Sequence, residues 1–536
     1  MSHPMKTLLS MLDNLLENSI ARRVEARSLQ DRAGVYRFCG PGALTGRSFH
    51  KTVKALDGIV IVWLLGLVLF AGCSFAPNYT KPPIQTPAAF KELTPPQFNP
   101  TDGWKTAEPG DNLMRGQWWE VFHDQELNAF ESQVAGSNQS VAAALANFLA
   151  ARAVVKQTRS QYFPTVSANP SVINSRQPSL STPSTSVTST EYALPMDASW
   201  EPDLWGRIRN TVKANSLEAQ ATLADLGNVR LTAQVEVAAD YFQLRVLDAQ
   251  KQLLETSAAA YQETLKLTRI QEGAGLASGQ DTDLAETQLE LTRAQATDLG
   301  IQRAQLEHAI AMLLGQSAST FSIATNSLGA KPVAVPFGVP SQLLERRPDI
   351  AAAERRVAEA NAQIGVARAA YYPSITLCGA VGYQSTSIKD LFSAPGLIWS
   401  VGSTLAQTLF DGGLRRAVTE QARAIYQGTV ANYRQTVLTA FQEVEDNLST
   451  LLILSQELRQ QDAAVAGSQG YLTLTQIRYQ SGLESYLDVI TAQTTLLTNQ
   501  RTALNLQMEQ LTASVQLIKA LGGGWDFSQG TAAAIL

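Results

Sequence analysis

The chain has 536 residues, of which 17% are charged and 7% aromatic, and its formal net charge is −5. A polypeptide of this length holds several domains or one elongated structure, and its acidic balance disfavours nucleic acid as a partner. Only four histidines and three cysteines are present, and the sequence has no GxSxG, HExxH or Walker motif. These features argue against a metal centre, a cofactor site and an enzyme.

The first feature along the chain is a strongly apolar run, GIVIVWLLGLVLFAG at 58–72, which follows Lys51 and Lys54 and precedes Cys73. Fifteen residues are short for a membrane span but typical of a secretory signal. The sequence LFAGC resembles a lipobox, in which cleavage leaves a lipid-bearing cysteine at the new N-terminus. Ser74, in place of aspartate, resembles lipoproteins sent to the outer membrane. A plain signal peptide or a short anchor is the alternative.

Residues 1–50 precede this signal, where a secretory chain should begin, so we interpret them as an over-long annotated start. Removal of residues 1–72 takes away nine Lys/Arg and five Asp/Glu, and the formal charge falls from −5 to −9. If Cys73 carries lipid, Cys378 is left as a single thiol. An intrachain disulfide is therefore excluded from the predicted mature protein.

The remainder of the chain contains a long internal duplication, which indicates two copies of one structural unit. GLASGQD at 275–281 matches GLESYLD at 482–488, an offset of 207 residues. QYFPTV at 161–166 matches AYYPSI at 370–375, an offset of 209 residues. About 175 residues therefore occur twice, which indicates a duplicated gene.

Each copy changes its periodicity in the same order. An alanine-rich helical run ends at a Tyr-Phe-Pro or Tyr-Tyr-Pro sequence, as proline requires. A stretch rich in Ser, Thr, Val and Tyr then predicts two β-strands joined by a turn. A long helix and a second, returning helix follow. In chain order the predicted elements are helix 139–160, hairpin 165–202, helices 208–272 and 279–314, helix 349–369, hairpin 374–410 and a last helix at 486–521.

The long helices predict rods. No proline occurs between Pro202 and Pro332, nor after Pro395, so residues 208–272 can form one helix on the order of 100 Å long. A periodic helix of that length with few large apolar residues is typical of a coiled coil. We interpret the acidic residues along it as solvated helix faces.

The two hairpins predict oligomerisation. Together they supply four strands, which cannot close into a barrel and leave unpaired edges. A sheet that crosses a bilayer must close, and several copies of the chain could close one. Three chains would give twelve strands, a number that these considerations allow but do not select.

The twin phrase predicts a turn between two antiparallel rods, at the end farthest from the strands. Ser278 and Asp281, like Ser485 and Asp488, match the capping-box pattern at a helix start. The preceding glycine is expected to end the incoming helix. On this interpretation alone, both aspartates cap helices and have no further role.

Four sequences carry a resemblance to a known family. These are ERRPDIAAAERRVAEANAQIGVARAAYYPSI at 345–375, DLWGR at 203–207, LFDGG at 409–413 and KALGGGW at 519–525. Together they resemble the outer-membrane factor family typified by TolC, and most closely its lipoprotein, NodT-type branch. The resemblance covers residues 74–525.

The resemblance implies an α+β membrane protein. Three chains would share a 12-stranded outer-membrane β-barrel, with four strands from each chain, and a long α-helical coiled-coil barrel would continue it across the periplasm. The expected divisions are a signal region at 1–72 (1–50 and 51–72), an anchor segment at 73–137, a first repeat at 138–315, a linker at 316–346, a second repeat at 347–522 and a tail at 523–536.

The resemblance also implies a function: a passive, gated outer-membrane duct of a tripartite efflux system that exports drugs or toxic solutes. Asp488 would line the aperture of the periplasmic tip as a ring of three carboxylates. Many relatives place another acidic residue where this chain has Thr491. The residues expected to meet an adaptor are Gly275, Leu276, Ser278, Asp281, Gly482, Leu483 and Ser485.

The implied partners are two sister copies, outer-membrane lipid, a periplasmic adaptor and an inner-membrane pump of the resistance-nodulation-division or a related class. Two other functions are considered. One is the duct of a type I protein secretion system, which shares the architecture. The other is a trimeric coiled-coil surface stalk, which should have one anchor per chain and not two hairpins.

Overall fold

The computed structural model describes residues 76–84, 90–91, 117–178, 186–326 and 346–523. The chain divides into two compact units. A β unit takes in residues 159–208 and 369–412, and a helical unit contains the described residues of 75–158, 209–368 and 413–536.

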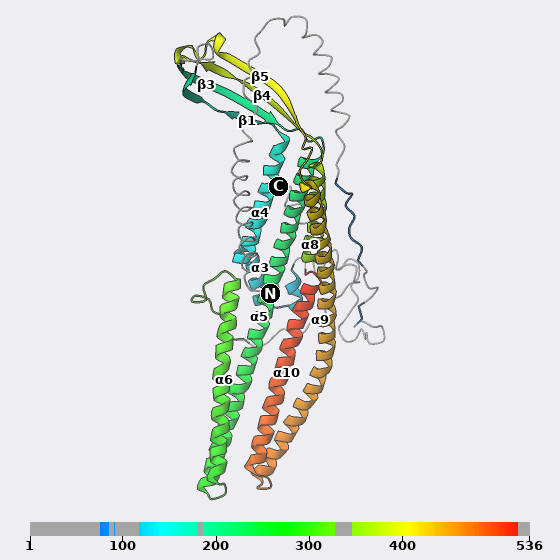
Figure 1. Ribbon diagram of the computed structural model, residues 1–536. Coiled ribbons are helices and arrows are strands. Elements are labelled where there is room, and N and C mark those ends of the chain that lie inside the picture. Colours follow the sequence, from blue (N-terminus) through cyan, green and yellow to red (C-terminus); the bar gives the residue numbers. More distant parts are fainter. Residues whose placement is uncertain (1–75, 85–89, 92–116, 179–185, 327–345, 524–536) are drawn as a thin grey trace, which may run out of the picture. The chain divides into compact units, whose positions relative to one another are not determined.

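The β unit is one antiparallel sheet, in which the two hairpins of the duplication lie side by side (Figure 1). The order is β1-β3-β4-β5, and β2 also pairs with β3. The pairing of β3 with β4 joins the hairpins and sets Met196 opposite Val381. The strands are β1 (Thr165–Ala168), β2 (Ser171–Pro178), β3 (Ser186–Trp200), β4 (Ser374–Ser385) and β5 (Leu397–Ala406).

The first hairpin differs from the prediction of two strands, because its first strand is interrupted. β1 and β2 pair with β3 in one continuous register, since Ala168 lies opposite Met196 and Ser171 lies opposite Ala193. The interruption at residues 169–170 has a chemical cause. Pro170 and, on β3, Pro195 have no backbone N–H to donate to the ladder.

The sheet has one apolar and one polar face. Because side chains alternate along a strand, the register sets odd residues of β4 and β5 on the same side as even residues of β1, β2 and β3. The opposite face has Gln384 bonded to Glu191 at 2.7 Å. The large apolar residues on the first face are Val166, Val172, Leu194, Met196, Trp200, Leu377, Val381, Trp399, Val401 and Leu405.

A glycine is required where the two hairpins meet. A Cβ atom built on Gly382 would lie 2.3 Å from the carbonyl oxygen of Leu194 and 2.6 Å from the Cα of Pro195. Neither atom belongs to a flexible side chain, so a larger residue would push β3 and β4 apart. The close approach of two backbones explains the glycine at this position.

The helical unit confirms the predicted helices to within one residue at almost every end. Of the four 3₁₀ segments described, η3 precedes α3, whereas η4, η5 and η6 belong to the β unit. The helices are η3 (Trp118–Phe122), α3 (Gln125–Ser137), α4 (Gln139–Arg159), η4 (Ser160–Tyr162), α5 (Arg207–Gly273), α6 (Gly279–Leu313), α8 (Pro348–Ala369), η5 (Ile388–Asp390), η6 (Ala394–Gly396), α9 (Leu414–Gln480) and α10 (Tyr486–Ala520).

The duplication is confirmed by the helix lengths. Helices α5 and α9 each have 67 residues, and α6 and α10 each have 35. Figure 1 shows α9 beside α10 and α5 beside α6. Both pairs begin and end at positions related by 207 residues, so the same local signals set the helix boundaries in both copies.

A compact core interrupts the predicted rod. Trp118 and Phe122 of η3 are buried, and the Phe122 ring lies 4.9 Å from that of Phe242 on α5. Aromatic rings bury a large apolar area, so this cluster fixes the 3₁₀ segment onto the middle of α5. The predicted coiled coil therefore includes a globular core around residues 231–244.

The prediction of solvated acidic residues along the rods is wrong for Asp248. Its buried carboxylate accepts from Arg245 at 3.2 Å and from Arg303 at 2.7 Å. Arg245 also donates to the carbonyl of Ala324 at 2.7 Å, and Arg303 donates to that of Ile323 at 2.7 Å. Buried charges require partners, and these hold the segment after α6 against α5.

Candidate functional site: the twin helical turns

The turn between α5 and α6 is built by backbone hydrogen bonds. Gly275 adopts a left-handed conformation with φ 72°. Its N–H donates to the carbonyl of Glu272 at 2.8 Å, and the N–H of Leu276 donates to that of Gln271 at 2.8 Å. This pair of bonds is the Schellman motif, which favours glycine at the left-handed position. Leu276, immediately after it, is 81% exposed.

The following helix begins at a complete capping box, as the sequence predicts. The N–H of Asp281 donates to the Ser278 hydroxyl at 3.3 Å. The N–H of Ser278 donates to the Asp281 carboxylate at 3.0 Å. Two backbone donors that would otherwise lack partners are thereby satisfied.

The turn between α9 and α10 repeats this geometry. Gly482 has φ 74°, and its N–H donates to the carbonyl of Tyr479 at 2.9 Å. The N–H of Leu483 donates to that of Arg478 at 2.8 Å, and the Leu483 side chain is 70% exposed. Ser485 and the residue three positions on again form a capping box. Both turns thus present one leucine to solvent on a fixed backbone.

The carboxylate of Asp488 accepts two hydrogen bonds from Ser485. The Ser485 N–H donates at 3.2 Å and the Ser485 hydroxyl at 2.5 Å. These bonds favour the charged form, so the pKa of Asp488 is lowered from its ordinary value. The carboxylate is therefore ionised at neutral pH. Thr491, one turn further along, donates its hydroxyl to the carbonyl of Leu487 at 2.8 Å.

The two turns differ in the side chains beside them, which the sequence reasoning missed. Tyr479, at the end of α9, donates its hydroxyl to the Gln271 side chain of α5 at 2.7 Å. Its ring lies 5.7 Å from that of Tyr486, which packs with Tyr261 of α5 in a buried cluster. In the first copy, residues of other types stand at the positions of these two tyrosines. This difference between the copies was the signal in the sequence that could have identified the tyrosine contacts.

A second local difference is an ion pair that spans only the turn between α9 and α10. The guanidinium of Arg478 lies 2.8 Å from the carboxylate of Glu484. Arg478 corresponds to Gln271, and Glu484 corresponds to Ala277, in the first copy. Because both side chains are partly exposed, this pair contributes little to stability.

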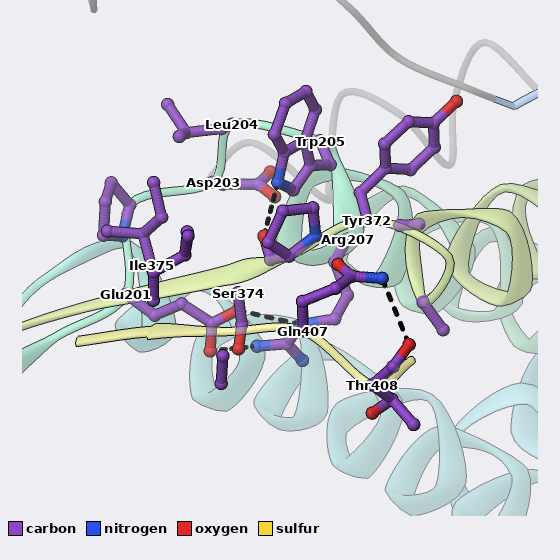
Figure 2. Close-up of a pocket in the computed structure, with 16 residues that line it drawn as sticks. Glu201, Asp203, Leu204, Trp205, Arg207, Tyr372, Ser374, Ile375, Gln407 and Thr408 are labelled. Atoms are coloured by element: carbon purple, nitrogen blue, oxygen red, sulfur yellow. Dashed lines mark hydrogen bonds and ion pairs between the residues drawn. The ribbon is translucent and has the colours of Figure 1, made fainter. Parts of the chain in front are cut away.

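The β unit holds a cavity of about 580 Å³ at the ends of β3, β4 and β5. Figure 2 shows Trp205 beside Tyr372, and their rings stack at 5.1 Å. Trp205 also donates its Nε1–H to the carbonyl of Pro373 at 2.7 Å. At the opposite wall, Arg207 pairs with Glu201 at 2.8 Å. No sequence prediction pointed to this cavity as a site.

Both outer edges of the sheet are unpaired within the described chain. The edge of β1 and β2 lies on one side, and the edge of β5 lies on the other. Trp399 and Val401 on β5, like Val172 on β2, are largely exposed. Free N–H and C=O groups next to exposed apolar side chains are suited to pairing with another strand.

Cys73 and the signal region lie outside the described residues, whereas Cys378 is described and is a free, partly exposed thiol on β4. Among the residues that are described, no helix is both long and apolar enough to cross a membrane. Nor does any cluster of three His, Cys, Asp or Glu side chains within those residues form a potential metal site.

Comparison with known proteins gives a consistent picture. Residues 131–316 and 339–523 both match the family described as outer membrane efflux protein. The solvent efflux pump outer membrane protein SrpC of Pseudomonas putida is 32% identical over 478 residues, which span 87% of this chain and 98% of SrpC. The cation efflux system protein CusC of Escherichia coli O6:H1 is 29% identical over 456 residues, 85% of this chain and 96% of CusC.

A solved structure has a similar fold. The outer-membrane channel OprN superposes with a TM-score of 0.77 at 29% sequence identity. The match covers 84% of this chain and all of the OprN chain. The two separate matches to one family model coincide with the two copies of the internal duplication.

Proposed function

Since this chain belongs to the outer membrane efflux protein family, we propose that it serves a tripartite efflux system as its passive, gated exit duct. It is an outer-membrane channel component, and no catalytic constellation is needed for such a role. The observation that carries the proposal is that both copies of the duplication match the family, over the nearly full length of efflux relatives.

The sheet supports a closed, three-chain barrel. Two free edges and one apolar face per chain leave a sheet that cannot be stable alone in a bilayer. Pairing of β5 with the β1 edge of the next copy would remove both edges. Three copies would then form twelve strands, with the apolar face toward lipid and the face that carries Glu191 and Gln384 toward water.

The twin turns support a role as the periplasmic tip. Leu276 and Leu483 are exposed on rigid Schellman turns, so each could enter an apolar groove without ordering the backbone. With Gly275, Ser278, Asp281, Gly482 and Ser485, they would form the surface that meets a periplasmic adaptor. An inner-membrane pump of the resistance-nodulation-division or a related class would supply substrate and energy through that adaptor.

Asp488 is proposed as the aperture residue. Its ionised carboxylate stands at the first turn of α10 and is partly exposed. Three copies would form a ring that attracts cations. Opening would require the α9–α10 turn to move away from α5, which breaks the bond between Tyr479 and Gln271. The resting tip and the open tip would be two packings of the same helices.

Cys73 is proposed to carry lipid at the start of the mature chain. The nature of the exported solute follows from the pump and not from this chain, since the relatives named above serve solvents and cations. The efflux relatives favour this role over protein secretion.

The decisive experiment deletes the gene and measures the tolerance of the strain to solvents, drugs and metal cations. Loss of tolerance, restored by the intact chain but not by a Cys73→Ala chain kept from the outer membrane, is expected. Purified protein should also form channels in planar bilayers. Unchanged tolerance to every compound, together with an absence of channels, would contradict the proposal.

A further inference from the structure

Each copy of the duplication has its first helix joined to its last by polar side chains. In the first copy, the Asn138 side chain donates from Nδ2 to the carbonyl of Leu313 at 2.8 Å, at the end of α6. The Oδ1 atom of Asn138 accepts from the N–H of Val141 at 3.0 Å, at the start of α4. The last carbonyls and the first N–H groups of a helix have no partner within it. A single amide therefore caps two helices at once.

In the second copy, two charged side chains make the equivalent contacts. Arg347 is the counterpart of Asn138 at the 209-residue offset, and its Nη1–H donates to the carbonyl of Ala520 at 3.1 Å, at the end of α10. Asp349 accepts from the N–H of Ile350 at 2.9 Å, at the start of α8, and pairs with Arg347 at 2.7 Å. A cation near a helix C-terminus and an anion near an N-terminus are both favourable.

The backbones approach each other in the same way in both copies. Gly315 and Gly522 follow the two capped helix ends, and both have a positive φ, of 67° and 94°. A Cβ atom on Gly315 would lie 2.3 Å from the carbonyl oxygen of Ser137, and one on Gly522 would lie 2.6 Å from that of Arg346. These residues are related by the same two offsets, 207 and 209. The two joints are therefore equivalent in geometry and differ in chemistry.

Arg347 makes one contact that Asn138 does not make. Its guanidinium pairs with Glu443 of α9 at 2.6 Å, and Arg347 is only 7% exposed. In the first copy the counterpart of Glu443 is Glu236, which is exposed. An amide presents two N–H donors, whereas a guanidinium presents five in a planar fork. Arginine can therefore join α8, α9 and α10 at one point.

Glu443 lies where α9 changes its neighbour. Before it, Tyr433 and Val437 of α9 pack with Ile350 of α8 in a buried cluster. After it, α9 lies beside α10 as far as the turn that joins them (Figure 1). Since α9 is one uninterrupted helix of 67 residues, a displacement of its second part relative to its first requires bending close to Glu443.

We propose that Arg347 is the clamp about which the α9–α10 pair moves when the channel opens. The clamp consists of its guanidinium with the bonds to Asp349, Glu443 and the carbonyl of Ala520. Asn138 has only the capping part of this role, because it reaches α4 and α6 but not α5. The inference rests on the proposed gate and assigns the residue that holds the gating helices at the end away from their turn.

The clamp has a consequence for the resting state. While it is closed, the end of α10 and the middle of α9 stay on α8, and displacement is confined to the part of the pair nearer the turn. The bond of Tyr479 to Gln271 holds that other end. Two fixed points make the pair harder to displace than one. Loss of the clamp should therefore favour the open packing, and openings should become more frequent.

A matched pair of variants tests the clamp in the intact protein. Glu443→Ala removes the bond of Arg347 to α9 and leaves both helix caps in place. Glu236→Ala removes the same charge from the counterpart position, where an amide stands at the cap. Hydrogen exchange with mass spectrometry should show residues 437–447 exchanging about fivefold faster in Glu443→Ala, because a partly exposed charged hydrogen bond is lost. Glu236→Ala should leave the protection of α5 unchanged.

An exchange of residues between the copies separates the two parts of the clamp. Arg347→Asn combined with Asp349→Ser gives the second copy the residues of the first, since Ser140 is the counterpart of Asp349. The equal approach of the backbones allows the new amide to reach the end of α10. Protection of residues 514–521 should therefore be kept, whereas that of residues 437–447 should fall. Loss of protection at both segments would contradict the equivalence of the two joints.

Planar bilayers test the consequence for gating. The readout is the ratio of open to closed time, because both single variants remove one negative charge and could alter conductance alike. Glu443→Ala should raise this ratio about fivefold, whereas Glu236→Ala should leave it at the parent value. Unchanged exchange at α9, or faster exchange with unchanged openings, would overturn the inference and leave the duct in place. If the parent forms no channels, the proposed function is overturned together with the clamp.

Discussion

Replacement of Glu131 by glutamine should stabilise α3, and the gain should grow with pH. The Glu131 side chain is completely buried, and its two carboxylate oxygens have no hydrogen-bond partner in the described part of the chain. Leu127 and Val134, one turn to either side, are buried as well. Burial disfavours the charged form, so the pKa of Glu131 is raised well above its ordinary value.

The direction of the pH effect follows from proton linkage. The raised pKa means that the folded protein keeps the proton on Glu131 while the unfolded chain, with a carboxyl pKa of about 4.3, releases it. The contribution of Glu131 to stability is therefore fully present below the unfolded pKa and is lost as pH rises toward the folded pKa. The unfolded pKa sets an upper limit on this loss between pH 5 and pH 7 of about 2.6 kcal/mol, or about 80-fold in the opening equilibrium.

Glutamine keeps the shape of the side chain but has no proton to lose. The ratio of amide-exchange protection in α3, Glu131→Gln over parent, should therefore rise from pH 5 to pH 7, by up to about 80-fold, after correction for intrinsic exchange rates. Hydrogen exchange with mass spectrometry measures this ratio on the intact protein. The exposed Glu120→Gln serves as the control for removal of a negative charge. A ratio that does not change with pH would refute the reasoning.

Three further changes test the tip and the sheet. Asp488→Ala should raise single-channel conductance and reduce cation preference in planar bilayers, whereas Asp281→Ala, at the equivalent turn, should change neither as much. Tyr479→Phe keeps the ring but removes the hydrogen bond to α5, which costs about 1 kcal/mol. Channel openings should therefore become more frequent in planar bilayers. An unchanged open probability would show that this bond does not hold the channel closed. Gly382→Ala should abolish folded outer-membrane protein because its Cβ meets a backbone carbonyl at 2.3 Å. The control Gly402→Ala should fold, because the space around its Cβ is open. Heat-dependent gel mobility distinguishes folded from unfolded protein.

The helices were predictable because their boundaries are set by short-range chemistry. Gly275 and Ser278 end one helix and start the next through bonds that reach no further than five residues. A seven-residue phrase in the sequence is therefore sufficient to locate the turn. The strands that follow the Tyr-Phe-Pro and Tyr-Tyr-Pro sequences were predicted from equally local signals. The interruption at residues 169–170 was missed, since it depends on two prolines brought together by the register.

The contacts that depend on distant segments could not be predicted. Arg245 bonds to residues 79 and 119 positions away, and the hydroxyl of Tyr479 bonds to a side chain 208 positions away. The sequence periodicity shows that a residue lies on a helix. It does not show whether an arginine or an acidic residue on that helix contacts water or another side chain. Asp248 was assigned to a solvated face for this reason.

Comparison of the two copies separates features set by neighbouring residues from contacts set by distant segments. At an offset of 207, the capping serines, the aspartates three residues on and the left-handed glycines are retained in both copies. At the same offset, the buried network of the first copy is lost, since Leu452, Ser455 and Gln510 stand where Arg245, Asp248 and Arg303 stand. Helix lengths are retained in both copies, whereas each copy packs against different neighbours. The second helix pair has a charged contact of its own, since Arg347, just before α8, pairs with Glu443 of α9 at 2.6 Å and donates to the carbonyl of Ala520 at 3.1 Å. Near the turns, the bond of Tyr479 to Gln271 joins α9 to α5 without a charge.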